Sequence, residues 1–161
     1  MDEAALKEIL LACLAECSHL TLATQTRGLP HAASVFYVNI GFDLYFLSSP
    51  RSLHGQHIAE NPLAAATINN DFDSWQDIKG LQLSGRADDI GGILQNMKIA
   101  RAYVQKFPDV KDFLLSPQSL GDIMAQKLAR VRFYRFRPSR ITFVNNALGF
   151  GHKEELVLEA D

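Results

Sequence analysis

The chain has few cysteines, no long apolar run and no excess of charge of either sign. Its 161 residues include only Cys13 and Cys17, and its formal net charge is -2. Two thiols at helical i,i+4 spacing would gain little from so local a disulfide, so we expect both to be buried thiols. No apolar run approaches the roughly 20 residues that cross a bilayer. A nearly neutral chain also gives no electrostatic case for nucleic acid as a partner.

Several motifs are also missing. The chain has no G-x-S-x-G nucleophile elbow, no phosphate-binding P-loop and no dinucleotide-binding glycine pattern. His54 and His57 share a helix face, but no third ligand with a matching spacing follows, so we expect no metal site. The acidic N-terminus lacks the basic region of a signal peptide, and we expect a cytoplasmic protein.

The hydrophobic pattern predicts one α+β domain over residues 1–161, with the strands curling into a small barrel flanked by helices. Apolar side chains recur every three or four positions over residues 2–17, which is typical of an amphipathic helix. The period then changes to two, and strands are predicted at 19–24, 31–40, 44–48, 63–68, 80–87, 129–137 and 140–144. Further helices are predicted at 53–60, 93–106, 109–115 and 120–127.

Residues 48–54 are the best candidate for an anion site. Ser48 and Ser52 supply hydroxyl groups, Arg51 a guanidinium and His54 an imidazole, at the start of the short helix predicted over 53–60. The first turn of a helix leaves amide N–H groups unpaired and carries partial positive charge, which suits a phosphate. The alternative is ordinary capping of the helix by Ser49 or Ser52, with Arg51 in solvent.

The second candidate is the C-terminal stretch from Phe143 to Lys153. It combines Asn145 and Asn146 with two glycines around Phe150, and His152 follows. Asparagine and glycine favour positive φ and allow the backbone to approach a neighbour closely. This composition predicts contact with a ligand or a partner subunit; the alternative is a surface turn between the last two strands.

Together these segments resemble one known family. The stretch LYFLSSPRSLHGQHIAENPLAAATI, the strand GLQLSGRA and the tail VNNALGFGHKEEL are similar to the pyridoxamine 5′-phosphate oxidase-like FMN-binding split barrels. The tail is most similar to a bacterial branch related to the YhbP proteins. The resemblance implies an antiparallel split β-barrel of six to seven strands with flanking helices. It also implies a homodimer that holds FMN in two clefts at its interface.

The resemblance further implies which residues form the site. Ser48, Arg51, Ser52 and His54 correspond to the phosphate end, and the strand at residues 33–37 to the backbone along the flavin ring. Lys79 or Gln82 would replace a flavin-contacting glutamine, and His152 of the partner subunit would be the catalytic proton donor. The expected cofactor-binding residues are Ser34, Val35, Phe36, Tyr37, Ser48, Arg51, Ser52, His54, Lys79, Gln82, Asn145 and Phe150.

The chain also departs from the oxidase. Leu53 and His54 stand where the oxidase has the arginine and lysine that grip phosphate, and Phe150 stands where it has the arginine two residues before the tail histidine. The second change argues against pyridoxine phosphate as a substrate. The first hypothesis is therefore an FMN-dependent oxidoreductase acting on another substrate. The alternatives are a flavin or small-anion binding module without turnover, a degenerate barrel without cofactor, and a heme-binding relative with His54, His57 or His152 as axial ligand.

Overall fold

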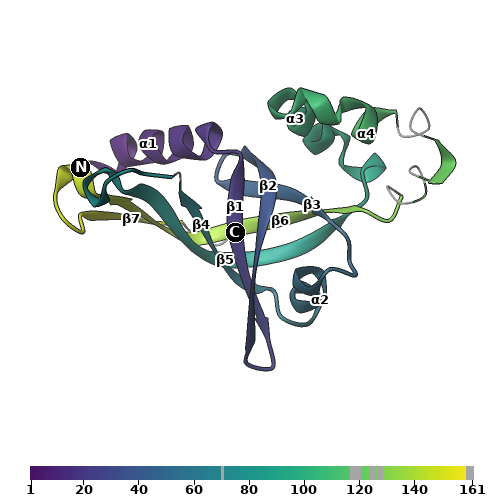
Figure 1. Ribbon diagram of the computed structural model, residues 1–161, viewed down its shortest axis with the longest axis horizontal. Helices are drawn as coiled ribbons and strands as arrows, with labels where there is room; N and C mark the ends of the chain where they lie inside the picture. The colour runs from purple at the N-terminus through teal and green to yellow at the C-terminus, as the bar shows by residue number, and fades with distance from the viewer. Residues whose placement is uncertain (70, 117–120, 124–125, 127–128, 159–161) are drawn as a thin grey trace.

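In the computed structural model, antiparallel strands form a sheet in which six strands close into a barrel (Figure 1). The structure describes residues 1–69, 71–116, 121–123, 126 and 129–158. Within them the strand order is β3-β2-β1-β4-β5-β6-β7, and a further pairing of β3 with β6 closes the ring. The strands are β1 (His19–Thr26), β2 (Leu29–Ile40), β3 (Asp43–Ser48), β4 (Leu63–Asn69), β5 (Lys79–Gly91), β6 (Arg132–Asn145) and β7 (Lys153–Val157). The predicted antiparallel split barrel is confirmed.

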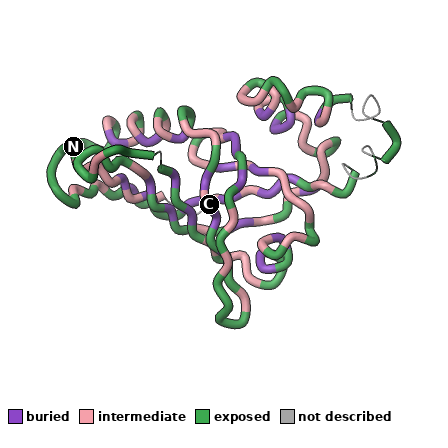
Figure 2. Tube along the Cα trace, in the orientation of Figure 1, coloured by how far each residue is buried: buried purple, intermediate pink, exposed green. Residues whose placement is uncertain are grey.

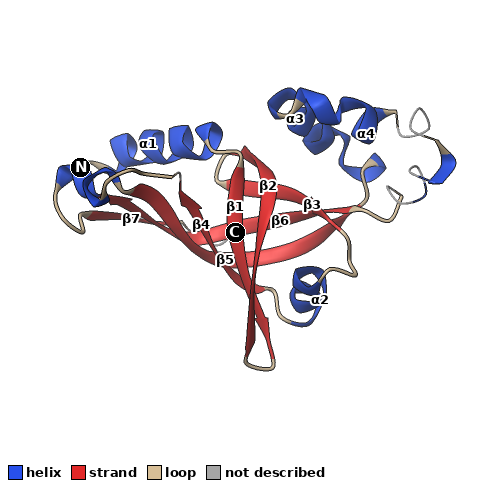
Figure 3. Cartoon of the chain, viewed as in Figure 1, coloured by secondary structure: helices blue, strands red, loops and turns tan. Residues whose placement is uncertain are grey.

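Helices flank this barrel on several sides (Figure 3). They are α1 (Glu3–Glu16), α2 (Leu53–Glu60), α3 (Met97–Lys106) and α4 (Lys111–Leu115). The Asp2 side chain accepts a hydrogen bond from the Ala5 amide at 2.8 Å and so caps α1. Helix α1 buries Leu6, Leu10 and Leu14 against the sheet. None of the helices in the described residues is long and apolar enough to cross a membrane.

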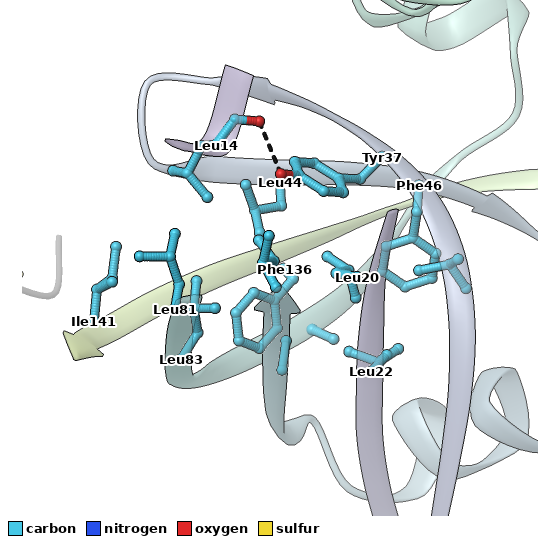
Figure 4. Packing of buried hydrophobic residues seen from close by; sticks show 14 of the residues in the cluster. Leu14, Leu20, Leu22, Tyr37, Leu44, Phe46, Leu81, Leu83, Phe136 and Ile141 are labelled. Atoms are coloured by element: carbon cyan, nitrogen blue, oxygen red, sulfur yellow. Dashed lines mark hydrogen bonds between the residues drawn. The ribbon is translucent and has the colours of Figure 1, made fainter. Parts of the chain in front are cut away.

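The core fills the barrel with side chains from alternate strand positions (Figures 2 and 4). Leu20 and Leu22 of β1, Phe46 of β3 and Phe136 of β6 are completely buried in it. The Tyr37 hydroxyl donates a hydrogen bond to the Leu14 carbonyl at 2.8 Å, which ties β2 to the end of α1. The outward residues of β2 and the end of β3 are left to form the site.

A second apolar cluster attaches α3 and α4 to the barrel. Ile99, Tyr103 and Leu114 of these helices pack with Val38 of β2 and Phe133 of β6. The Tyr103 hydroxyl donates to the Phe36 carbonyl at 2.6 Å, a contact between residues far apart in the sequence. The two helices therefore stand over the β2–β3 side of the barrel (Figure 1), and Lys106 at the end of α3 reaches the C-terminal end of α1.

Both cysteines lie on or at the end of α1. Cys13 and Cys17 form no disulfide and are half-buried against the core. Burial raises the pKa of both thiols, because the charged thiolate is disfavoured away from water. They are therefore packing residues, as the sequence indicates, although less deeply buried than expected.

The two strands predicted at 129–137 and 140–144 are one continuous strand, β6. Pro138 interrupts the sequence pattern, but in the structure it faces Gly85 at a β-bulge, where the register with β5 shifts after Ser84. A bulge tolerates proline because the ladder is locally interrupted there. Ser139, the extra residue, donates its hydroxyl hydrogen to the Ser84 carbonyl at 3.2 Å.

The C-terminal segment 146–152 connects β6 to β7, a strand that was not predicted. It has the geometry of the surface-turn alternative: a short 3-10 turn over Asn146–Leu148 is followed by Gly149 and Gly151. Half of the helix predicted at 120–127 falls outside the described residues.

Candidate functional site

Two serines and a histidine meet at the start of α2. The Ser48 Oγ lies 2.6 Å from His54 Nε2 and 3.1 Å from Ser52 Oγ. Ser52 is the N-cap: its Oγ accepts the Gly55 amide hydrogen at 3.1 Å and donates to the Ser49 carbonyl at 2.7 Å. The capping predicted as the alternative is therefore present. It still leaves the amides of the first two helical residues without an acceptor inside the helix.

Only glycine fits at position 55, because other atoms already occupy the space that a side chain would need. A Cβ at Gly55 would lie 2.7 Å from the Ser49 carbonyl oxygen and 3.1 Å from the Tyr134 hydroxyl. Any larger residue would push the helix away from the serine loop. The start of α2 is thus held against both its own loop and β6.

Two further imidazoles adjoin His54. The His31 ring of β2 is parallel to the His54 ring, with centroids 6.2 Å apart. His57, one turn along α2, meets His31 edge-on at 5.9 Å. His57 is buried, and its Nδ1 lies 3.2 Å from the Thr24 Oγ1. We call His31, His54 and His57 the histidine cluster; within the described residues, no group of His, Cys, Asp or Glu has the geometry of a metal site.

Burial lowers the pKa of His54, and the neighbouring His31 and His57 lower it further. The charged imidazolium is disfavoured both by loss of water and by repulsion from other positive rings. His54 is consequently a neutral ring near pH 7, able to accept the Ser48 proton or to donate its own.

A pocket of about 420 Å³ opens beside Ser48 and His54. Volumes of roughly 300–1,000 Å³ are typical of small-molecule sites. Its walls come from β2, the end of β3, and the segment from α3 to α4. The lining residues are Ser34, Val35, Phe36, Leu47, Ser48, His54, Tyr103, Phe107, Asp109, Val110 and Phe113. The pocket is mostly apolar and aromatic, with its hydroxyl and imidazole groups at one end.

The structure thus brings together part of the predicted site. Ser34, Val35 and Phe36 line the same pocket as Ser48 and His54. The Tyr37 side chain points instead into the core, and the residue is completely buried. Arg51 is exposed and does not line the pocket; its backbone amide donates to Ser49 Oγ at 3.2 Å.

The remaining predicted residues lie at the other end of the barrel. Lys79 pairs with Asn145 across β5 and β6, and Gln82 lies on the same stretch of β5. His152 Nε2 lies 3.2 Å from the Glu154 carboxylate, in the loop before β7. In Figure 1 this loop and α2 are on opposite sides of the molecule, so one chain does not bring the two groups together.

Phe150 is strongly exposed, at 87%. Its ring meets the Trp75 ring edge-on at 5.5 Å. Asn146 connects the loop at Trp75 with the segment 146–152. Its amide nitrogen donates to the Trp75 carbonyl at 2.8 Å, and its Oδ1 accepts the Gly151 amide hydrogen. The tail therefore presents an ordered pair of aromatic rings to solvent.

The outer face of four neighbouring strands extends from the pocket beside Ser48 to the other end of the barrel, where the C-terminal tail lies. Two adjacent rows cross β2, β1, β4 and β5, and none of their residues carries a charge. The rows are Ser34-Thr21-Thr67-Gln82 and Ala32-Ala23-Ala65-Ser84. All except the half-exposed Thr21 are exposed. We call these eight residues the uncharged face.

Sequence reasoning did not identify His31 or the aromatic residues of the α3–α4 segment. It considered His57 as a metal ligand, which it rejected, and as an axial ligand in the heme-binding alternative, and it considered the residues of α3 and α4 only as helix formers. Phe107 meets Phe36 edge-on at 5.5 Å, and Tyr103 is buried, which raises the pKa of its hydroxyl. No local signal marks these residues, because their partners lie on strands far away in the chain.

The comparisons with known proteins agree with this geometry. No family model matches the chain. A UPF0306 protein of Klebsiella pneumoniae (strain 342) is 30% identical over 125 residues, which cover 75% of this chain and 72% of the relative. The chain belongs to the UPF0306 family. The UPF0306 protein YhbP of Escherichia coli O157:H7 is 28% identical over 146 residues, 87% of this chain and 85% of the relative.

Solved structures related to this UPF0306 chain share its barrel. A Listeria innocua protein provisionally assigned as a pyridoxamine 5′-phosphate oxidase has a TM-score of 0.66 at 20% identity, over 87% of this chain and 98% of that one. The heme storage protein HutZ of Vibrio cholerae has a TM-score of 0.65 at 16% identity, over 94% of each chain. At these identities the comparison establishes the split-barrel fold alone.

Proposed function

We propose that this UPF0306 chain is a homodimeric FMN-binding protein and acts as a flavin-dependent oxidoreductase. The observation that carries the proposal is the Ser48–Ser52–His54 cluster, which opens onto an aromatic pocket of about 420 Å³. A phosphate group and a flat ring system are the two chemical parts that such a site suits.

The phosphate end is supported by donors. Ser48 and His54 are already within hydrogen-bond distance of one another and can turn to a phosphate oxygen, and the first amides of α2 add two backbone donors. Ser52 holds the loop in place through its cap. Arg51 is close in sequence, and its long exposed side chain is proposed to reach the same anion.

The ring end is supported by the pocket walls. The β2 backbone at Ser34 and Phe36 forms one side, and Phe107 and Phe113 from the helical segment form the other. Aromatic side chains pack favourably against flat conjugated rings. FMN, when bound, would supply the redox chemistry of its ring, while the chain supplies binding and orientation.

The homodimer completes the site in this proposal. Ser34 and Gln82 lie at opposite ends of one row of the uncharged face. Four strands at about 4.8 Å spacing place them roughly 14 Å apart. A second copy packed on this face about a two-fold axis would bring its own tail toward the pocket of the first. His152 of the partner subunit would then act as proton donor, with Lys79, Gln82, Asn145 and Phe150 lining the cleft.

The test is a titration of the purified protein with FMN, followed by flavin fluorescence, with riboflavin as the ligand that lacks the phosphate. We expect micromolar binding of FMN and much weaker binding of riboflavin. Ser48→Ala should weaken FMN binding and leave riboflavin binding unchanged, whereas Ser18→Ala, between α1 and β1 and outside the pocket lining, is the matched serine control. Equal affinity for the two flavins would contradict a phosphate site at α2.

Turnover separates the enzyme from a binding module. Stopped-flow reduction of the bound flavin by a nicotinamide cofactor, with reoxidation by an added electron acceptor, would support the oxidoreductase. His152→Gln should slow reduction or reoxidation while FMN affinity stays the same. Binding without any reduction under these conditions would favour the non-catalytic alternative.

Heme is a second candidate, and the histidine cluster is the observation that favours it. Three imidazoles lie beside an apolar pocket, and the fold neighbour HutZ is a heme storage protein. A heme titration with a Soret shift that is lost in His54→Gln would support this reading. A normal FMN titration with no Soret shift would reject it.

A further inference from the structure

The proposed phosphate site has no cationic side chain in its wall. Among the described residues that line the pocket, Asp109 is the one with a charged side chain, and its charge is negative. A phosphate monoester carries a charge of about -1.5 to -2 near neutral pH. Hydroxyl and amide donors alone would leave this charge largely uncompensated in a half-buried site. Arg51, which lies outside the lining, is proposed to supply one positive charge, and a second has to come from a group at this end of the pocket.

The histidine cluster is the group in position to supply it. His54 lines the pocket and contacts Ser48, and His31 is parallel to it at a centroid distance of 6.2 Å. No hydrogen bond is found for the His31 ring within the described chain, and its side chain is half-exposed. Both rings can therefore turn a nitrogen toward an anion at the pocket mouth.

The hydrogen-bond pattern around Ser48 also allows His54 to carry an additional proton. The single hydroxyl proton of Ser52 goes to the Ser49 carbonyl. The Ser48 proton then goes to Ser52 or to His54 Nε2, depending on the tautomer of His54. A protonated His54 would donate from Nε2 to Ser48 or to a phosphate oxygen, and the Ser48 hydroxyl would donate its one proton either to Ser52 or to the same anion. Without the anion, the network accepts one more proton on His54 and keeps each of these contacts.

We propose that His54 and His31 bind the phosphate monoester as ligands of imidazolium type, so that binding of the dianion takes up a proton from solvent. This inference rests on the proposed function, because it concerns the same site. It assigns His31 to the site as a phosphate ligand. His57, fixed by Thr24 and edge-on to His31, is a positioning residue for the pair.

The other cationic groups around α2 lie outside the pocket lining, and Arg51 would act beside the histidines rather than in their place. The helix packs on β1, β2 and β5. Glu60 at its end contacts Thr26 and Arg27, Arg132 is paired with Asp89 at 2.6 Å, and the Tyr134 hydroxyl lies at the buried side of Gly55. The remaining charged or titratable groups on these elements or across the pocket are His19, Tyr37, Arg51, Lys79, Arg86, Asp88, Tyr103 and Asp109.

Proton uptake has a defined consequence for affinity. In the free protein, burial and the adjoining rings lower the pKa of His54, so the His54 ring is mostly neutral above pH 6.5. If one proton is taken up on binding, the affinity for FMN falls about tenfold per pH unit above pH 6.5. The phosphate itself stays dianionic in that range, since its second pKa is about 6. Riboflavin, without a phosphate, should show no such slope.

The experiment measures FMN and riboflavin affinities between pH 6.5 and 8.5 for the wild type, His31→Gln and His19→Gln. His19 is an exposed histidine of β1 outside the pocket lining and serves as the matched control. We expect the slope for FMN in the wild type and in His19→Gln. His31→Gln should bind FMN about tenfold more weakly at pH 6.5 and show a flatter profile. A flat FMN profile in the wild type would overturn the inference and leave FMN binding itself intact.

A second measurement does not depend on any variant. The His54 Cε1–H resonance is titrated by NMR with and without FMN, or with inorganic phosphate if FMN does not bind. The inference predicts that the titration of His54 moves to higher pH with the anion, while the His19 resonance stays unchanged. An unchanged His54 titration with both probes would overturn it. Movement with phosphate but no binding of FMN would retain the anion site and reject the flavin.

Discussion

At the scale of single residues, His54 links the site to the pH response of the fold. Its imidazole is half-buried between Ser48, Phe46 and His31. Burial and its neighbours lower the pKa of His54 in the folded chain. The unfolded chain therefore binds more protons than the folded one just below pH 6.5, so stability is full above that pH and falls as the pH decreases.

We therefore expect the urea midpoint of the ligand-free protein to decrease between pH 7.5 and pH 5.5. In His54→Gln part of that decrease should disappear, because glutamine keeps a polar contact with Ser48 but does not titrate. His19→Gln, in an exposed position, should retain the whole pH dependence. An identical decrease in all three proteins would assign it to carboxylates elsewhere.

Lys106 is a second residue whose role depends on distant partners. Its Nζ donates to the Cys17 carbonyl at 2.6 Å and the Leu14 carbonyl at 3.3 Å, and lies 4.3 Å from the centre of the Tyr37 ring. It thus caps the C-terminal end of α1 from α3. We expect Lys106→Met to lower the free energy of unfolding by about 1–2 kcal/mol, since it removes hydrogen bonds from a charged donor and a cation–π contact.

Thermal and denaturant unfolding would measure this loss. Lys98→Met, on the exposed side of the same helix, is the matched control and should change stability little. A loss of the same size in both variants would point to the charge of α3 rather than to the cap on α1.

At the scale of elements, the sequence predicts well those strands and helices whose signals lie within a few neighbouring residues. The first three strands and α2 are found close to their predicted bounds, since alternation and turn residues are read over a few positions. β6 was divided in two because Pro138 normally ends a strand. The bulge that accommodates it depends on Gly85, on a strand more than fifty residues earlier, and no local pattern reports that pairing.

Gly85 therefore gives a sharp prediction. A Cβ at this position would lie 2.1 Å from the Arg137 carbonyl oxygen, a backbone atom that cannot move without opening the barrel. Gly85→Ala should destabilise the protein by about 3 kcal/mol through overpacking of the bulge. Gly92→Ala is the control, because its Cβ would meet only the flexible Gln95 side chain, at 3.4 Å. Equal unfolding midpoints for the two variants would mean that the bulge relaxes.

At the scale of the whole molecule, the site is only partly visible in the sequence. The residues from Ser48 to His54 adjoin one another, and their chemistry could be predicted from a seven-residue segment. His31 joins them across β2, and Tyr103 and Phe107 come from a helix that packs back over the pocket. The tail residues stay at the other end of the barrel, so the complete predicted site requires a second copy of the chain.

The uncharged face is where that second copy should pack. Ala23 is central on this face, with Ala32 on one side and Ala65 on the other. In a two-fold interface, Ala23→Glu would place a carboxylate from each subunit in a surface without a compensating charge, and a buried unpaired charge is strongly unfavourable. We expect sedimentation to give a dimer for the wild type and a monomer for Ala23→Glu, with weakened FMN binding because the partner's side of the cleft is lost.

The control separates assembly from folding. Ala12→Glu adds the same charge on the exposed side of α1, away from this face, and should remain dimeric with unchanged FMN affinity. Both variants should keep the circular dichroism spectrum of the wild type. If Ala23→Glu stays dimeric, the subunits meet elsewhere. If it becomes monomeric and still binds FMN fully, one chain suffices for the cofactor. Lys79 and the tail residues Asn145, Phe150 and His152 then have another role.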